Sequence, residues 1–469
     1  MELDPLLLSR FQFAFVVSFH AIFPVFTIGL AAYIAVLEAL YYRTDNPVWE
    51  KLSKFWIKVF ALVFGMGVVS GIVMAFQFGT NWSTFSYSAA NFLGPILSYE
   101  VVTAFFLEAT FLGVLLFGRD RVPKGAHLFS ACMVAIGTFI SSFWILSANS
   151  WMHTPAGVEL SDGIVQVTSW TQAIFNSSLP YRFAHMALAS FITGGFVVAG
   201  VSAWYLLNGR NLETSRKALK MTIIMLAIAT PLQLVVGDLH GLNTFENQPV
   251  KVAAMEGHWN TQEGAPLILF AIPDSRNETN HLQIAIPKLG SLILTHSLDG
   301  EVTGLTSVPP EDRPPVGIVF WSFRIMVGLG IIFILLSLAS AWQLWHGRLE
   351  QSPRLLRALT WMIPLPFVAV LAGWFVTEVG RQPWLIQDLM RLNDGVTPSL
   401  TGGMVLLTLV GYIAVYAVVF TAGLHYLKRV ITAGPDPVDA APKDDTARPK
   451  RPWSAVPTGL EDEAAKERS

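Results

Sequence analysis

Residues 11–40 read FQFAFVVSFHAIFPVFTIGLAAYIAVLEAL, and this stretch decides the fold. It is apolar on nearly all sides and exceeds the ~20 residues that a helix needs to cross a bilayer. Eight further runs of this kind follow at 55–78, 92–117, 127–148, 182–207, 218–236, 316–345, 358–379 and 402–427. The ~10-residue alternating segments of a membrane β-barrel are absent. The sequence therefore predicts an all-α, polytopic membrane protein with about nine transmembrane helices arranged as helical bundles.

The composition supports this class and excludes several others. Of the 469 residues, 53% are hydrophobic and 14% are charged, against roughly 25% charged residues in soluble domains. A net charge of −2 predicts no nucleic-acid partner. The single cysteine, Cys132, excludes an intrachain disulfide, a CxxCH heme attachment and any cluster held by several thiolates. A bound metal must therefore be held by His, Met or carboxylate side chains.

The basic residues predict which way the helices run. They gather in every second connection, whereas the connection 79–91 has no charge and 149–181 has neither Lys nor Arg. This places the N-terminus outside and the C-terminus in the cytoplasm. The basic connections contain Arg43, Lys51 and Lys54; Arg119, Arg121 and Lys124; Arg210, Arg216, Lys217 and Lys220; and Arg348, Arg354 and Arg357.

Four regions follow from this pattern. Residues 1–237 are expected to form transmembrane helices 1 to 6, and 316–433 helices 7 to 9. Between them, residues 238–315 form an outer loop that is longer than a simple connection between two helices needs to be. This loop is therefore a candidate functional segment. Residues 434–469, rich in Pro, Ala, Asp and Lys, are predicted to be a disordered cytoplasmic tail.

Ionisable side chains inside spans are costly unless they are paired, ligated or hydrated, so they are the first candidates for function. By depth, five side chains should lie in the outer half of the bilayer, where they could form one buried cluster: His20, Glu100, His185, Met326 and Glu378. Neutral His, thioether and carboxylate groups are all competent axial ligands of heme iron. Arg182 and Arg381 are suitably placed to neutralise heme propionates.

Each of these residues also has a purely structural interpretation. A lone His in a span can be a hydrogen-bonded packing residue, and a Met there is more often part of the core. Glu378 could be an interfacial carboxylate paired with Arg381 at i+3, with Pro383 ending the helix. A heme protein is therefore plausible from the residues alone, without being established.

Two further groups of polar residues suggest proton transfer and substrate binding. Glu100 and Glu108 lie ~12 Å apart along a helix and ~80° apart around it, which suits two stations of a proton path near Ser141. The alternative is that both carboxyls are protonated and only hydrogen-bonded. In the outer loop, Lys251 and Glu256 could hold a lipophilic substrate with a polar head and accept its protons, or be an exposed pair without a role.

Together these residues resemble subunit I of the cytochrome bd family of quinol oxidases over residues 5–427. The resemblance is carried by LLSRFQF (7–13) leading to His20, FISSFWIL (139–146), ANSWM (148–152), FRIMV (323–327), GWF (373–375) and GRQPW (380–384). The outer loop is shorter than in the long-loop members. The chain thus resembles the short-loop branch, which includes cyanide-insensitive oxidases.

The resemblance implies three hemes and a role for each candidate. His185 and Met326 would ligate a low-spin b heme near the outer surface, while His20 and Glu378 would each ligate one heme of a di-heme oxygen site, with b and either d or b hemes. Glu100, Glu108 and Ser141 match proton-pathway positions, and Lys251 and Glu256 match the quinol-binding loop. Arg10, Arg324, Trp374 and Arg381 match residues around the hemes.

The implied reaction is electron transfer from a quinol, ubiquinol or menaquinol, to O2, which becomes water without proton pumping. A second large membrane subunit, often a small single-span subunit, and membrane lipids are the implied partners. One residue departs from the pattern: residue 153 is His where an amide is expected in the better-known members. His153 is expected to be a packing residue at the outer surface or a propionate contact.

Two other functions remain open from the residues. A proton-coupled secondary transporter would use the buried Glu and His side chains as its substrate site, and the glycine-rich sequence from Gly65 to Gly71 is a mild point in its favour. A heme-bearing quinone reductase anchor without oxygen chemistry would need His185 and Met326 but not His20 and Glu378.

Overall fold

The computed structural model describes residues 3–435 and has long apolar helices as its main elements. Eight of these are long and apolar enough to cross a membrane, and a bent pair makes up to nine within the described residues. The predicted fold class is thus confirmed. The spans are α1 (Pro5–Thr44), α2 (Pro47–Thr80), α4 (Ala90–Glu100) with η1 (Val101–Phe105) and α5 (Phe106–Phe117), α6 (Lys124–His153), α8 (Leu179–Leu207), α9 (Leu212–Asn247), α12 (Val316–Trp345), the bent pair α13 (Pro353–Trp361) and α14 (Leu365–Val379), and α16 (Gly402–Ala433).

Local sequence signals set where α1 and α2 begin. The Asp4 carboxylate accepts a hydrogen bond from the Leu6 N–H at 2.9 Å, and Pro5 occupies the first turn of α1. The Asn46 side chain caps α2 in the same way, accepting from the Val48 N–H at 3.0 Å, and Pro47 is the first residue of the helix. An N-cap acceptor followed by proline satisfies a free N–H and presets the backbone for a helix.

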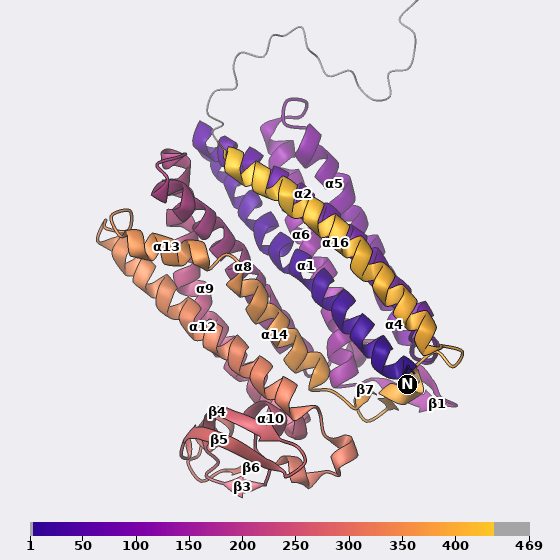
Figure 1. Ribbon diagram of the computed structural model, residues 1–469. Coiled ribbons are helices and arrows are strands. Elements are labelled where there is room, and N and C mark those ends of the chain that lie inside the picture. Colours follow the sequence, from indigo (N-terminus) through magenta and orange to yellow (C-terminus); the bar gives the residue numbers. More distant parts are fainter. Residues whose placement is uncertain (1–2, 436–469) are drawn as a thin grey trace, which may run out of the picture. The chain divides into compact units, whose positions relative to one another are not determined.

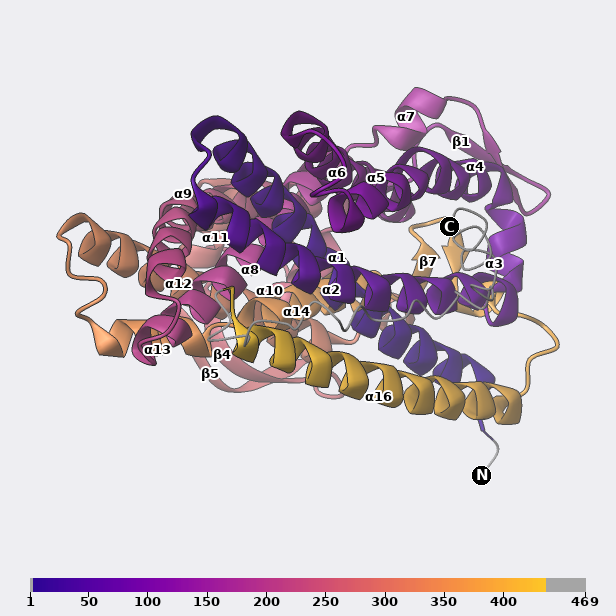
Figure 2. The same cartoon turned by 90° about the horizontal axis from the view of Figure 1, so that it is seen from above.

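The first helix lies at the centre of the bundle and packs against α2, α6, α8, α14 and α16. Its approach to α8 depends on Gly29, where a Cβ atom would lie 2.2 Å from the Ser190 carbonyl oxygen. Small residues at such crossings let helix backbones pack closely in a membrane. A second core joins α8, α9, α12 and α13 around Phe196 and Phe333. Figure 2 shows α12 and α13 at one side of the bundle and α4 at the other.

The segments outside the spans gather at one end of the bundle, which is also the end that holds the N-terminus (Figure 1). They contain four two-stranded antiparallel sheets, β1–β2, β3–β6, β4–β5 and β7–β8, which the all-α expectation did not include. The elements are α3 (Ser83–Ser88), β1 (Val158–Ser161), β2 (Ile164–Val167), α7 (Trp170–Ile174), α10 (Pro249–Glu256), β3 (Gln262–Glu263), β4 (Leu267–Asp274), β5 (Thr279–Ile286), α11 (Leu289–Thr295), β6 (Glu301–Val302), η2 (Leu305–Ser307), η3 (Pro310–Asp312), β7 (Trp384–Ile386), β8 (Met390–Arg391) and α15 (Leu392–Gly395).

Three spans differ in detail from the sequence expectation. Helix α9 continues to Asn247, so the first ten residues assigned to the outer loop are helical. The third span contains a π-helical turn at Val101–Phe105. The eighth span bends by 40° between α13 and α14, where Pro364 and Pro366 remove backbone donors and favour a kink. The predicted tail lies, from residue 436 onward, outside the described residues.

Candidate active site

Glu378, at the end of α14, is the centre of a buried polar cluster. Its carboxylate accepts hydrogen bonds from Asn149 Nδ2 of α6 at 2.7 Å and from Arg381 Nη2 at 2.5 Å. His153 Nε2, one turn beyond Asn149, lies 3.6 Å from Glu378 Oε1. The i+3 pair that the sequence suggested is therefore formed, and it belongs to a network that joins α14 to the end of α6.

Lys251, on α10, reaches this cluster from the outer loop. Its ammonium donates to His153 Nδ1 at 3.1 Å and to Gln248 Oε1 at 3.1 Å, and the residue is 4% exposed. A Cβ atom on Gly380 would lie 2.9 Å from Lys251 Cε, so the lysine stem runs directly over the backbone that follows Glu378. Burial, together with Arg182 and Arg381, lowers the pKa of Lys251 well below its usual range.

The cluster carries more positive than negative charge. Arg182, Lys251 and Arg381 are all buried, and each interacts electrostatically with one carboxylate, Glu378. Within the described residues, Arg182 Nε and both Nε and Nη1 of Arg381 lack a hydrogen-bond partner. Burial also lowers the pKa of Arg381. Unpaired buried cations are costly, so this cluster is suited to a bound anionic group.

Glu256 of α10 and Arg324 of α12 form a separate pair. Glu256 Oε2 accepts from Arg324 Nη2 at 2.7 Å, and Arg324 Nε donates to the Ile268 carbonyl oxygen at 2.7 Å. Lys251 and Glu256 are both buried, not exposed, and they face different partners. Arg324 thereby fixes β4 and the end of α10 to α12.

His20, on α1, contacts a hydroxyl group of α2. Its Nδ1 lies 2.9 Å from Ser70 Oγ, which in turn lies 2.9 Å from the Gly67 carbonyl oxygen. When the Ser70 hydroxyl donates to Gly67, it accepts from Nδ1 of His20. In that tautomer the Nε2 lone pair is available, which is the form of histidine that binds a metal.

His185 and Met326 lie on α8 and α12. The His185 ring is 5.6 Å, centroid to centroid, from the ring of His240 on α9. His185 Nδ1 and, on α14, Trp374 Nε1 are buried and have no hydrogen-bond partner among residues 3–435. Arg10 Nε is likewise unpartnered, while Arg10 Nη2 donates to Gln382 Oε1.

His20, His185 and Met326, the candidate heme ligands on α1, α8 and α12, each face a glycine on a neighbouring helix. A Cβ atom would lie 3.1 Å from His20 Cε1 at Gly71, 3.4 Å from His185 Cε1 at Gly237 and 3.0 Å from Met326 Sδ at Gly373. These glycines permit the close approach of α2, α9 and α14 to the ligand side chains.

The predicted proton stations lie together in one part of the bundle. Ser141 Oγ donates to Glu100 Oε1 at 2.7 Å, as the predicted depth of Ser141 suggested. Glu108 is buried, and Gly137 of α6 leaves room for it, since a Cβ atom there would lie 2.7 Å from Glu108 Cγ. The π turn between the two glutamates adds about one residue to a turn. This reduces their angular separation from about 80° to about 20°.

The family of the chain follows from comparison with known proteins. A model of the cytochrome bd terminal oxidase subunit I family matches residues 8–435. The chain belongs to this family. The membership confirms the predicted family and the predicted class of enzyme, a quinol oxidase.

Individual relatives agree over nearly the full length. The chain is 33% identical to subunit 1 of the cytochrome bd-II ubiquinol oxidase of Escherichia coli strain K12, covering 92% of this chain and 97% of the relative. It is 36% identical to the cytochrome bd ubiquinol oxidase subunit 1 of Bacillus subtilis strain 168, covering 89% and 91%. A solved bd oxidase structure from Geobacillus thermodenitrificans matches with a TM-score of 0.85 at 31% identity, over 92% of this chain and 99% of that chain.

A cytochrome bd subunit implies heme cofactors, and the residues fit them. In the part of the chain that the structure describes, no three His, Cys, Asp or Glu side chains form a ligand set for a bare metal ion. A porphyrin supplies the in-plane ligands itself and needs only axial side chains. The unpartnered donors of Arg182 and Arg381 match its anionic propionates.

Two residues of this candidate site were not expected from the sequence. Asn149 lies within the ANSWM segment, and His240 lies in the helical extension of α9. His153 was expected to be a packing or propionate contact; its Nδ1 is hydrogen-bonded to Lys251, and its Nε2 lies 3.6 Å from Glu378 without a hydrogen-bond partner among the described residues. Its buried position at the end of a span, opposite the loop lysine, was the signal that could have marked it.

A second buried cluster, around Glu38, was also missed. The Glu38 carboxylate accepts from Arg119 Nη1 at 3.1 Å, lies 3.0 Å from His127 Nδ1, and is also bonded by Ser53. His127 Nε2 faces the Leu115 carbonyl oxygen at 3.1 Å. These side chains join α1, α2, α5 and α6 at the end opposite Glu378. An acidic residue inside the first apolar run, read together with the basic connection at Arg119, could have predicted the pair.

Proposed function

We propose that this chain is the heme-bearing catalytic subunit of a quinol:oxygen oxidoreductase that oxidises quinol on the outer side and reduces O2 to water at a di-heme site. Membership in a terminal oxidase family favours this function over a transporter or an oxygen-independent anchor. The observation that carries the proposal is the excess of buried positive charge around Glu378. Two buried arginines, Arg182 and Arg381, and the buried Lys251 face one carboxylate there, and Arg182 Nε and Arg381 Nε and Nη1 have no hydrogen-bond partner among the described residues.

The cofactor assignment extends this observation to the ligands. His185 and Met326 would hold a low-spin b heme, and His20 and Glu378 would each hold one heme of the oxygen-reducing pair. Arg182 and Arg381 would bind propionates, with Arg10, Arg324 and Trp374 nearby. When bound, the hemes supply one-electron transfer and oxygen binding. The contact of His20 Nδ1 with Ser70 supports its assignment because it engages Nδ1 and leaves Nε2 free for iron.

Quinol is assigned to the α10 segment. When protonated, Lys251 has three N–H donors, of which His153 and Gln248 use two, so one would remain for a quinol oxygen. Glu256, held by Arg324, would accept a proton as the quinol is oxidised. Ubiquinol and menaquinol both present the hydroxyl group that this arrangement would bind.

Protons for water formation would come from the cytoplasm past Glu108 and then Glu100. The hydrogen bond from Ser141 to Glu100, and the alignment of both carboxyls by the π turn, support this order. Quinol protons would leave on the outer side, so charge is separated across the membrane without a pump. The basic connections support this orientation, with the N-terminus outside.

The assembly would lie in a bacterial inner membrane with a second large subunit, and in the family often with a small single-span subunit as well. Family membership implies the second subunit, and apolar side chains on α5 and α16 support partner or lipid contacts, since Phe106 is 59% and Leu407 75% exposed. Such faces are stable only against lipid or another membrane helix.

The quinol assignment is tested by replacing the loop lysine and its acceptor. Lys251→Ala and His153→Leu should each raise the quinol KM about fivefold or more, the value of roughly one hydrogen bond, with all heme absorption bands intact. His153→Gln keeps an acceptor for the lysine and should restore a KM close to that of the wild type. Loss of heme in Lys251→Ala would show that the loop is structural, and an unchanged KM would contradict the quinol site.

A further inference from the structure

A cavity between the end of α12 and the start of α13 lies far from the proposed heme and quinol residues. It has a volume of about 580 Å³. Ala339, one of its lining residues, is thirteen residues beyond Met326, or ~20 Å along α12. It lies at the end of the bundle opposite the outer segments, next to the basic connection 346–352.

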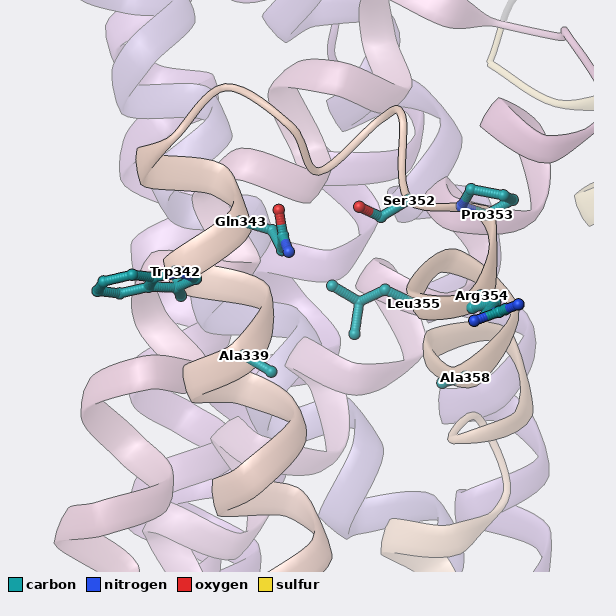
Figure 3. Close-up of a pocket in the computed structure, with 8 residues that line it drawn as sticks. All are labelled: Ala339, Trp342, Gln343, Ser352, Pro353, Arg354, Leu355 and Ala358. Atoms are coloured by element: carbon teal, nitrogen blue, oxygen red, sulfur yellow. The ribbon is translucent and has the colours of Figure 1, made fainter.

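The cavity has a polar end and an apolar end. Gln343 and Ser352 point toward one another beside the connecting loop, and Leu355 reaches between the two helices below them (Figure 3). Ala339 and Ala358 line the deeper part. Such a gradient along a membrane-facing groove matches an amphiphile whose head lies at the interface and whose chain lies along the helices.

The charge around the polar end is positive. Arg354 lines the cavity and Arg357 follows one turn later; both are exposed, and neither side chain has an ion pair or hydrogen bond with a described residue. The one nearby acid, Glu350, is paired with Arg216 at 2.8 Å. Free arginine side chains beside a membrane surface attract anionic lipid head groups.

The position of α13 is that of an interfacial helix. Leu356 and Leu359 are buried against the bundle, whereas Arg354 and Arg357 face outward. Two tryptophans beside the cavity, Trp342 and Trp361, are 66% and 77% exposed. Exposed tryptophan is typical of the membrane interface, where the ring lies at head-group level.

We propose that this cavity binds an anionic glycerophospholipid of the surrounding leaflet. Its phosphate would be held by Arg354, with Gln343 and Ser352 as neutral partners, and Arg357 would add attraction for the negative head group. One acyl chain would lie along Leu355, Ala339 and Ala358. The lipid would fill the space between α12 and the bent eighth span, and so hold α13 at its angle to α14.

The test is native mass spectrometry of the complete oxidase, delipidated and then titrated with phosphatidylglycerol or with phosphatidylethanolamine. The wild-type complex should retain phosphatidylglycerol in preference, and Arg354→Gln with Arg357→Gln should weaken this binding by about fivefold for each arginine removed. Arg121→Gln is the matched control, an exposed arginine of another basic connection, and should change nothing. Ala358→Trp should displace lipid of either head group.

Three results would overturn the proposal. These are equal retention of the two lipids, unchanged phosphatidylglycerol binding in the double arginine variant, and full lipid binding in Ala358→Trp. Crosslinking of Ala358→Cys to a partner subunit, in a Cys132→Ser background, would also overturn it, because the cavity would then be a protein interface. Heme absorbance, recorded in parallel, verifies that each variant is folded.

Discussion

At the scale of single residues, the ligand candidates share a packing arrangement that ties them to particular glycines. His20, His185 and Met326 lie on three different helices, and each contacts a glycine of a neighbouring helix. Any side chain at Gly71 or Gly373 would press on the ligand atom. The glycine-rich segment that offered mild support for a transporter thus has a different use, since Gly71 makes room for His20.

The assignment of Met326 predicts a selective spectral change. Met326→Leu keeps a similar volume but removes the thioether sulfur, so the low-spin heme bands should shift or lose intensity while the other heme bands remain. Met225→Leu, at a packing methionine of α9, is the matched control and should leave every band unchanged. Identical low-spin bands in wild type and Met326→Leu would mean that another side chain is the ligand.

Most residues of the candidate site could be predicted from the sequence, because a charged or ligating side chain is conspicuous in an apolar run. Their hydrogen-bond and ion-pair partners could not be predicted. Lys251 and Glu256 look like a pair in the sequence, yet each binds a residue far away in the chain, His153 and Arg324. Such contacts depend on how the helices pack, which hydropathy does not encode.

At the scale of elements, most spans were predictable and their irregularities were not. An apolar run fixes where a helix crosses the membrane, but a π turn costs only one displaced backbone hydrogen bond and leaves no clear composition signal. The extension of α9 beyond its apolar run was also hidden, because Asp238, His240 and Asn243 are compatible with either a loop or a solvated helix. The bend before α14 was detectable in principle from its prolines.

The π turn predicts an effect of its own on proton delivery. Inserting one alanine after Phe106 adds one α-helical step between the two glutamates and should rotate Glu100 by about 100° relative to Glu108. Oxygen-consuming turnover should then fall about tenfold or more, because aligned proton donors contribute on the order of 10²-fold, while the heme bands persist. The control is deletion of Val102, which is exposed; it converts the π turn to α-helix, leaves seven α-helical steps between the glutamates and so keeps the two carboxyls about 20° apart. Normal turnover after the insertion would show that the alignment has no role in proton transfer.

At the scale of the whole molecule, the distribution of charge predicts the orientation of the bundle. All outer segments and the N-terminus lie at one end (Figure 1), and the basic connections lie at the other. The charged share of 14% is thus concentrated outside the spans, while the few charges within them form the Glu378 and Glu38 clusters and the predicted proton path.

Orientation is measurable by cysteine labelling in a Cys132→Ser background. Asp162→Cys, in the turn between β1 and β2, should react with a membrane-impermeant maleimide in intact spheroplasts. Arg121→Cys, in a basic connection, should react only after the membrane is permeabilised. The reverse pattern would contradict the positive-inside assignment and, with it, the direction of proton uptake.

The central claim is that this chain holds a low-spin heme and a separate oxygen-reactive pair. A reduced-minus-oxidised optical spectrum of the purified oxidase, recorded with and without carbon monoxide, tests it most directly. We expect low-spin b bands that carbon monoxide does not change, together with high-spin bands that it does. A low-spin signal with no species that reacts with carbon monoxide, or no heme signal at all, would contradict it.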